Sequence, residues 1–148
     1  RHTEVELHLP ALIPDDYLGD VHTRLMLYKR IASAPDDEGL DRLTEEMVDR
    51  FGVLPPQTAN LFQVARLRLR AAALGIRKLE LGALGGRVLF FPNPPVDALV
   101  VIRMVQKLPK VYALDGPDKL KVRLELPGAA ERLRTAGDIL RVLGGQSG

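Results

Sequence analysis

The stretch DRFGVLPPQTANLFQVARLRLRAAALGIRKL, residues 49–79, decides the fold that this sequence predicts. Gly52 stands where a helix would end on a left-handed residue. Pro55 and Pro56 prevent that helix from continuing and favour the start of a second helix directly after it. The stretch therefore contains one helix end, a tight turn, a long helix and the beginning of a strand at Ile76.

The long helix, residues 57–74, has no internal glycine or proline. Its apolar residues cover most of the helix surface: Leu61, Val64, Ala65, Leu67, Leu69, Ala71, Ala72 and Leu74. A helix that is apolar around most of its circumference is usually buried on several sides. We therefore expect a central helix with other helices on its N-terminal side and a sheet on its C-terminal side.

Composition sets the outer limits. Hydrophobic residues make up 46% of the 148 residues, which is enough for one domain with a packed core. The absence of cysteine excludes a disulfide framework and fits a reducing compartment, so we expect a cytoplasmic location. No apolar run approaches the roughly 18 residues of a membrane span, and no segment resembles a signal peptide. Residue 1 is Arg rather than Met, so we expect a segment of a longer protein.

The formal charge of +2 is unevenly distributed. Residues 1–60 contain 6 Lys/Arg and 12 Asp/Glu, whereas residues 61–148 contain 15 and 7. An acidic half joined to a basic half indicates two surfaces with different partners. The alternative is that each helix and strand is solvated by whichever charge is at hand, and the charges alone leave both interpretations open.

The N-terminal part predicts a short strand and two helices. Residues 5–9 alternate between apolar and polar side chains, which is typical of a strand. Asp20 is positioned to cap a helix over residues 21–34, and Asp36 or Asp37 to cap a second helix that ends at Phe51. We expect the first helix to bury Val21, Leu25, Tyr28 and Ala32, with Leu27 and Ile31 beside them.

The second helix has the clearest division into two faces. Leu40, Leu43, Met47 and Phe51 recur at spacings of three and four, so they share one side. Arg42, Glu45, Glu46 and Asp49 fall on the opposite side. These carboxylates are candidates for binding a partner. They could equally belong to a solvated surface, because Arg42 with Glu46 and Glu46 with Arg50 are spaced as supporting ion pairs.

The C-terminal half predicts the order strand, strand, helix, twice over. The first pair of strands spans residues 77–81 and 87–91, with glycines 82, 85 and 86 in the turn, and a mostly buried helix follows at 98–108. The second pair spans 110–114 and 120–126, and the last helix buries Leu133, Ala136, Leu140 and Leu143. The predicted class is α+β, with the N-terminal helices packed on a mixed, largely antiparallel sheet and two further helices. We divide the single domain, 1–148, into a connecting strand (1–10), a helical part (14–75), a sheet with two helices (76–143) and a tail (144–148).

A search for chemistry finds no catalytic, cofactor-binding or metal-binding residues. His2, His8 and His22 have no metal-ligand spacing, and no phosphate-binding loop or dinucleotide fingerprint is present. Arg68 falls on the apolar side of the central helix, where we expect an ion pair with a carboxylate. Several basic residues could contact phosphate, namely Arg66, Arg70, Lys110, Lys119, Lys121 and Arg123.

Three segments in register carry a family resemblance: LIPDDYLGDVHTRLMLYKRIASA (12–34), VDRFGVLPP (48–56) and LGIRKLEL (74–81). They resemble the C-terminal domain of bacterial transcription-repair coupling factors (Mfd). The resemblance extends over residues 4–143 and is looser in the sheet half. It implies a regulatory domain that is not itself an enzyme. The parent would be an ATP-dependent DNA translocase, with ATP and magnesium bound in its motor domains rather than here.

The resemblance also implies a partner. In such proteins the C-terminal domain packs against the UvrB-like module of the same chain and hides the surface that recruits UvrA until the motor engages RNA polymerase. Carried across by residue, Glu46 and Asp49 match the position of that contact, and Glu45 lies beside them. Two alternatives stay open: a nucleic-acid-binding module that uses the basic second half, and a structural adaptor without a switch.

Overall fold

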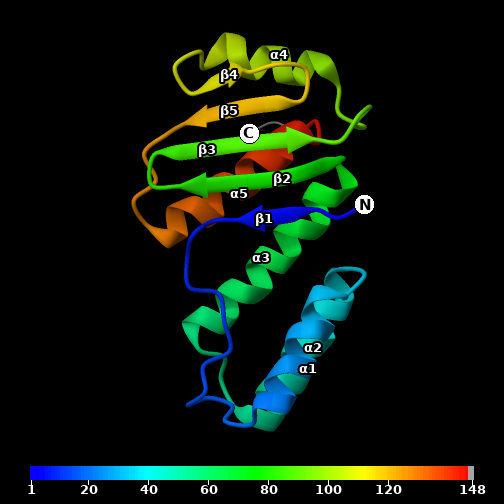
Figure 1. Cartoon of the computed structure of the whole chain (residues 1–148), viewed down its shortest axis with the longest axis vertical. Helices are drawn as coiled ribbons and strands as arrows, with labels where there is room; N and C mark the ends of the chain where they lie inside the picture. Colours follow the sequence, from blue (N-terminus) through cyan, green and yellow to red (C-terminus); the bar gives the residue numbers. More distant parts are fainter. Residues whose placement is uncertain (147–148) are drawn as a thin grey trace. The chain divides into compact units, whose positions relative to one another are not determined.

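The computed structural model describes residues 1–146, which form two compact units. Residues 9–69 form one unit, here called the helical unit. Residues 1–8 together with the chain from Arg70 onward form the other, here called the sheet unit. Figure 1 shows the elements of each. The division of the chain into a single domain with four parts stays a prediction, and its tail, 144–148, lies partly outside the described residues.

Three helices dominate the helical unit: α1 (Val21–Ala32), α2 (Asp37–Phe51) and most of α3 (Pro56–Ala73). Side-chain caps fix the first two starts. Asp20 accepts a hydrogen bond from the Thr23 amide at 3.1 Å, and Asp36 accepts one from the Gly39 amide at 2.8 Å. Asp36, rather than Asp37, is therefore the cap of α2. α2 ends before Gly52, which has a φ of 97°, so a residue with positive φ does follow the helix as the sequence predicts.

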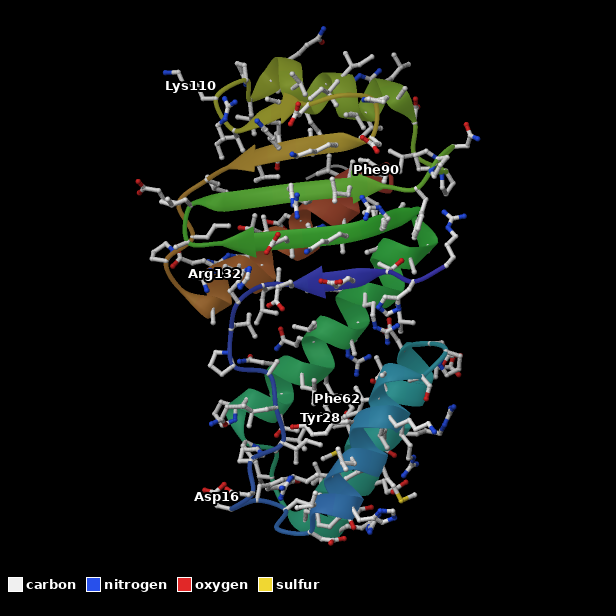
Figure 2. The ribbon with its side chains drawn as sticks, viewed as in Figure 1. Asp16, Tyr28, Phe62, Phe90, Lys110 and Arg132 are labelled. Carbon is white, nitrogen blue, oxygen red and sulfur yellow. The ribbon has the colours of Figure 1, made fainter. Side chains whose placement is uncertain are left out.

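One hydrophobic cluster holds the helical unit together: Ile13, Leu18, Leu27, Ile31, Leu40, Leu43, Met47, Phe62 and Ala65. Tyr28 and Phe62, labelled in Figure 2, come from α1 and α3. The predicted buried face of α1 was wrong, because Leu27 and Ile31 are buried whereas Leu25 is 61% exposed. Leu27 and Ile31 are buried because they pack in the cluster with residues of α2, α3 and the preceding loop. The Tyr28 hydroxyl accepts a hydrogen bond from the Ile13 amide of that loop at 2.7 Å.

Helix α3 is less buried than its composition predicts. Phe62 and Leu67 are buried, but Leu61 and Val64 are only half-buried. The Thr58 hydroxyl, fully buried near the helix start, donates a hydrogen bond to the Leu12 carbonyl at 2.9 Å. Within the helical unit, α3 therefore meets the core along a stripe and leaves other apolar side chains partly in water.

The sheet unit is built on five strands in the order β1-β2-β3-β5-β4. Their bounds are β1 (Glu4–Glu6), β2 (Ile76–Gly82), β3 (Gly85–Phe90), β4 (Tyr112–Leu114) and β5 (Lys119–Arg123). β1 runs parallel to β2, and every other pairing is antiparallel, as the strands of Figure 1 show. The predicted α+β class and its mixed, largely antiparallel sheet are confirmed. The predicted strand at 120–126 is shorter, because pairing with β3 and β4 ends at Arg123.

The β2–β3 hairpin depends on close backbone approach rather than on glycines in its turn. Ala83 and Leu84 form the two-residue connection, and the glycines flank it. Gly85 has a φ of 102°, which favours glycine. A Cβ added to Gly86 would lie 1.8 Å from the Glu80 carbonyl oxygen, so no side chain fits there.

Two helices complete the sheet unit, α4 (Ala98–Lys107) and α5 (Ala129–Leu143). α5 contacts β2 and buries Ala136, Ile139, Leu140 and Leu143. The prediction that α4 is mostly buried was wrong, since Met104 is its only buried residue. The main contacts of α4 are with the short edge strand β4 and the helix α5, so a narrow stripe attaches it and Leu99 and Ile102 remain exposed.

Candidate functional site

The acidic face of α2 is the candidate site that the sequence predicts. The helix turns Leu40, Leu43 and Met47 into the core of the helical unit. Glu45 and Asp49 therefore lie on the exposed side. Glu46 lies between the two sides, with 35% of its side chain exposed. The structure places the three predicted residues on one helix, but it gives them different surroundings.

Glu46 is held by two arginines. Its carboxylate accepts two hydrogen bonds from the Arg30 guanidinium of α1, at 2.7 and 2.9 Å, and Arg50 approaches the same group at 3.2 Å. A bidentate guanidinium–carboxylate pair fixes both position and orientation. The hydrogen bonds from Arg30, and then those from Arg50, lower the pKa of Glu46 to about 2, against its own partial burial. Glu46 therefore joins α1 to α2 as a permanently charged group.

Sequence reasoning missed Arg30 as the partner of Glu46. The predicted pair between Glu46 and Arg50, one turn apart on α2, does form. The other predicted pair does not: among residues 1–146, Arg42 forms no salt bridge. Periodicity within either helix could not reveal Arg30, since the contact depends on how α1 and α2 are placed side by side.

Glu45 and Asp49 have no cation of their own. In the part of the chain that the structure describes, neither carboxylate takes part in a salt bridge or a side-chain hydrogen bond. They are four residues apart, so they are neighbours on the helix surface, and like charges at this spacing destabilise a helix by a few tenths of a kcal/mol. A basic partner would remove this repulsion and gain attraction from both groups.

The predicted phosphate-contacting residues are divided between paired and free cations. Arg66 pairs with Asp41 at 2.6 Å, and Lys119 and Lys121 both approach Asp115, at 3.2 and 3.6 Å. Arg70, Lys110 and Arg123 form no salt bridge within residues 1–146. Three of the six cations thus already have a carboxylate partner, which weakens the alternative of a nucleic-acid-binding module that uses the basic second half.

Arg68 has a structural role, although not the predicted one. Its guanidinium donates to the Ala32 carbonyl at 3.0 Å, and no carboxylate partner is found for it among the described residues. Ala32 is the last residue of α1, where carbonyl groups lack helical partners and the helix dipole favours a cation. The expected ion pair was wrong because a helix end satisfies the arginine instead.

Other classes of site are not found in the described chain. No group of three or more His, Asp or Glu side chains over residues 1–146 could hold a metal ion. His8 instead contacts the Glu80 carboxylate through Nε2 at 2.8 Å, and this contact lowers the pKa of Glu80. The helices of the same region are too short or too polar to cross a bilayer.

The architecture defines an α+β domain: a helical unit that exposes Glu45 and Asp49 on α2, and a sheet unit with a basic excess. A family model described as TRCF domain matches residues 7–100, and the chain is 43% identical over 143 residues to the transcription-repair-coupling factors of Haemophilus influenzae and Escherichia coli. The chain therefore belongs to the transcription-repair coupling factor family, as its sequence motifs predicted.

The matched regions define how much of those relatives the chain represents. Each alignment covers 97% of this chain and 12% of the relative. The crystal structure of a C-terminal domain of transcription-repair coupling factor covers 99% of this chain with a TM-score of 0.73 at 19% sequence identity, which establishes a shared fold. The chain thus corresponds to one small part of much longer relatives.

Proposed function

We propose that this chain is the regulatory C-terminal module of a transcription-coupled DNA repair translocase in the cytoplasm. It masks the UvrA-recruiting surface of a UvrB-like module until RNA polymerase is engaged. The observation that carries the proposal is the pair of exposed, unpaired carboxylates, Glu45 and Asp49, on α2 of a chain that belongs to this family.

The three acidic residues have separate roles in this proposal. Asp49 and Glu45 meet basic side chains of the UvrB-like module, because both are free to accept new hydrogen bonds. Glu46 already accepts hydrogen bonds from Arg30 through both carboxylate oxygens, so its main role is to orient α2. It can contribute to the partner contact only through the remaining lone pairs of those oxygens. The binding face therefore consists of free carboxylates beside one fixed carboxylate.

Masking requires an equilibrium that a partner can shift. The module binds the UvrB-like surface in a closed state and leaves it in an open state, and polymerase engagement favours the open state because it contacts only that one. Contacts worth a few kcal/mol are enough, since a change of about 1.4 kcal/mol alters the ratio of states tenfold. Two charge pairs at a partly desolvated interface can supply an energy of this size.

The test uses a double charge reversal that leaves Glu46 in place. Full-length protein carrying Glu45→Arg and Asp49→Arg should bind UvrA without polymerase or ATP, because repulsion would open the closed state. The matched control reverses Asp118 and Glu125, two exposed carboxylates of the sheet unit that form no salt bridge within residues 1–146, with the same change in net charge. UvrA pull-down by parent, variant and control is compared.

Melting curves of the 148-residue chain accompany the pull-down. The double reversal should change the free energy of unfolding by no more than about 0.5 kcal/mol, because both side chains are exposed and unpaired. Equal weak binding of UvrA by parent and variant, with the variant folded, would contradict the proposal. Equal gain of binding by variant and control would assign the effect to net charge and would also contradict it.

The proposal includes a regulatory rather than catalytic role for the module. The sequence contains no phosphate-binding loop with which to hold a nucleotide. The purified chain should therefore turn over ATP no faster than buffer, with or without DNA. Turnover that persists through further purification would show that the module has a catalytic activity of its own.

A further inference from the structure

A cavity of about 540 Å³ lies in the sheet unit, and all its lining residues belong to that unit. Its apolar lining comes from α4 (Met104), the segment that follows α4 (Leu108), β4 (Tyr112) and α5 (Val142). Leu108 is 52% exposed, so this lining is open to solvent. An apolar recess of this size can accept one or two large side chains of a partner.

Basic residues form the rim of the cavity. Arg103 and Lys107 both line it and are four residues apart on α4, so their charges are neighbours on one face of the helix. Lys110, labelled in Figure 2, follows directly after α4 and is exposed. None of the three takes part in a salt bridge within residues 1–146.

Several other cations of the sheet unit do have a carboxylate partner. Lys78 and Arg87 pair with Glu80, and Lys119 and Lys121 both approach Asp115. Burial, and then the charge of Asp138, raise the pKa of the Tyr112 hydroxyl in the cavity. Asp138 itself pairs with Arg141. Tyr112 is therefore a neutral hydroxyl in a recess whose rim keeps its positive charge.

We propose that the α4–α5 cavity binds an acidic amphipathic segment of a partner protein, with apolar side chains in the recess and carboxylates on Arg103 and Lys107. Glutamates one helical turn apart on the partner match the spacing of the two cations. The apolar side chains remove the exposed Leu108 from water and supply hydrophobic binding energy. The charges select an acidic partner over a basic one.

The same features favour a peptide over nucleic acid. Phosphate backbones are bound by extended basic stripes, and single strands require aromatic stacking platforms. Here the rim is short, the two lysines of β5 share the single carboxylate of Asp115, and Tyr112 is the one aromatic side chain among the described residues that line the recess. An apolar recess gives a phosphate few charges or hydrogen-bond donors to bind, whereas it can bury a leucine or phenylalanine side chain.

The test uses a fluorescein-labelled synthetic peptide of about 16 residues, roughly four helical turns, with glutamates on one face and leucines and one phenylalanine on the other. One comparison peptide replaces glutamate by glutamine, and another replaces the apolar residues by serine. Fluorescence anisotropy with the 148-residue chain should show binding of the first peptide only, weakened at least tenfold by high salt. Amide chemical shifts should change at Arg103–Leu108, Tyr112 and Val142.

Variants locate the site. Arg103→Glu with Lys107→Glu should weaken peptide binding at least tenfold. Arg77→Glu with Arg134→Glu, the same charge change on exposed residues that do not line the cavity, should leave it within twofold. If the first variant fails to fold, the map of chemical shifts on the parent chain decides. Equal binding of the acidic and glutamine peptides, shift changes confined to α2, or duplex DNA bound at this cavity in place of the peptide would each overturn the proposal.

Discussion

The two units carry opposite charge, and each leaves a similar feature unpaired. The helical unit has 7 Lys/Arg and 10 Asp/Glu, and the sheet unit has 14 and 9. Each unit presents two like charges one turn apart on an exposed helix: Glu45 and Asp49 on α2, and Arg103 and Lys107 on α4. If our two proposals hold, surplus charge in each unit marks a face that a partner of opposite charge covers.

The units also differ in how their cores are built. The core of the helical unit is one cluster of side chains from three helices and a loop, so single large residues carry much of it. In the sheet unit, backbone pairing among five strands fixes the positions of Leu79, Val88 and Leu120, all of them fully buried. Side-chain deletions should test the first kind of core, and backbone crowding should test the second.

The largest effect is expected in the helical core. Phe62 is 4% exposed, so Phe62→Ala should lower the free energy of unfolding by about 3–5 kcal/mol through lost burial and a residual cavity. Leu61→Ala, at the adjacent half-buried position, is the control and should cost less than about 2 kcal/mol. Urea unfolding followed by circular dichroism measures both. Equal losses would show that α3 is buried around its circumference, as its composition first indicated.

Backbone crowding in the sheet unit should give the next largest effect. Gly86→Ala would place a methyl group against the Glu80 carbonyl, so we expect a loss of about 2–4 kcal/mol. Gly82→Ala is matched, because its Cβ would meet nothing closer than 3.7 Å, and it should cost less than about 1 kcal/mol. Thermal melting of the two variants decides. A Gly86 variant as stable as the parent would mean that β2 and β3 can separate at little cost.

A smaller effect on stability should distinguish Asp36 from Asp37, the two aspartates at the start of α2. Asp36 accepts a hydrogen bond from the Gly39 amide, so Asp36→Ala should cost about 1 kcal/mol. Asp37 instead approaches Arg66 at 3.3 Å on the surface, and Asp37→Ala should cost only a few tenths of a kcal/mol. Urea midpoints of the pair provide the comparison. The reverse order would place the cap of α2 one residue later.

The smallest effect concerns the pH dependence of Glu46. Its folded pKa of about 2 lies below the ordinary value of 4.5, so its contribution to stability is present above pH 4.5 and is lost as the pH falls towards 2. The side chain is 35% exposed, which limits that contribution to about 1 kcal/mol or less. Glu46→Gln should therefore lose less stability than the parent between pH 4.5 and 2.

Glu45→Gln is the control for this pH dependence, since Glu45 has no cation in the described chain. Its unfolding curves should follow those of the parent throughout the acid range. If Glu46→Gln also followed the parent, the bidentate contact with Arg30 would not persist in solution, and α2 would have three free carboxylates instead of two.

The sequence predicted those features that short-range chemistry determines. Asp20 and Pro56 begin helices as expected, and the strand-strand-helix order recurs as predicted. Contacts between elements were not predictable in the same way. Helical periodicity shows that α1 has apolar residues, but Leu25 and Leu27 are equally apolar, and packing with other elements in the cluster decides which is buried.

For the candidate site too, the local features were predictable from the sequence and the contacts between elements were not. The position of Glu45, Glu46 and Asp49 on α2 follows from spacing, and the structure agrees with it. Glu46 differs from its neighbours only because Arg30 of another helix reaches it, and no repeat within α2 contains that information. The α4–α5 cavity was missed because its lining comes from separate segments of the sequence, which extend from Val100 to Gln146.

The position of β1 has a consequence for how the chain acquires its structure. β1 has only three residues, and its partner β2 lies far along the chain: Thr3, beside β1, donates a hydrogen bond to the carbonyl of Ile76, 73 residues later. The helical unit is contiguous and lies entirely between these partners. During synthesis from the N-terminus, residues 9–69 can fold before β2 has been synthesised, when β1 has no strand to pair with. Folding of the helical unit shortens the loop that must close before β1 can pair with β2. We therefore expect the local helical contacts to form first and the pairing of β1 with β2 to form last.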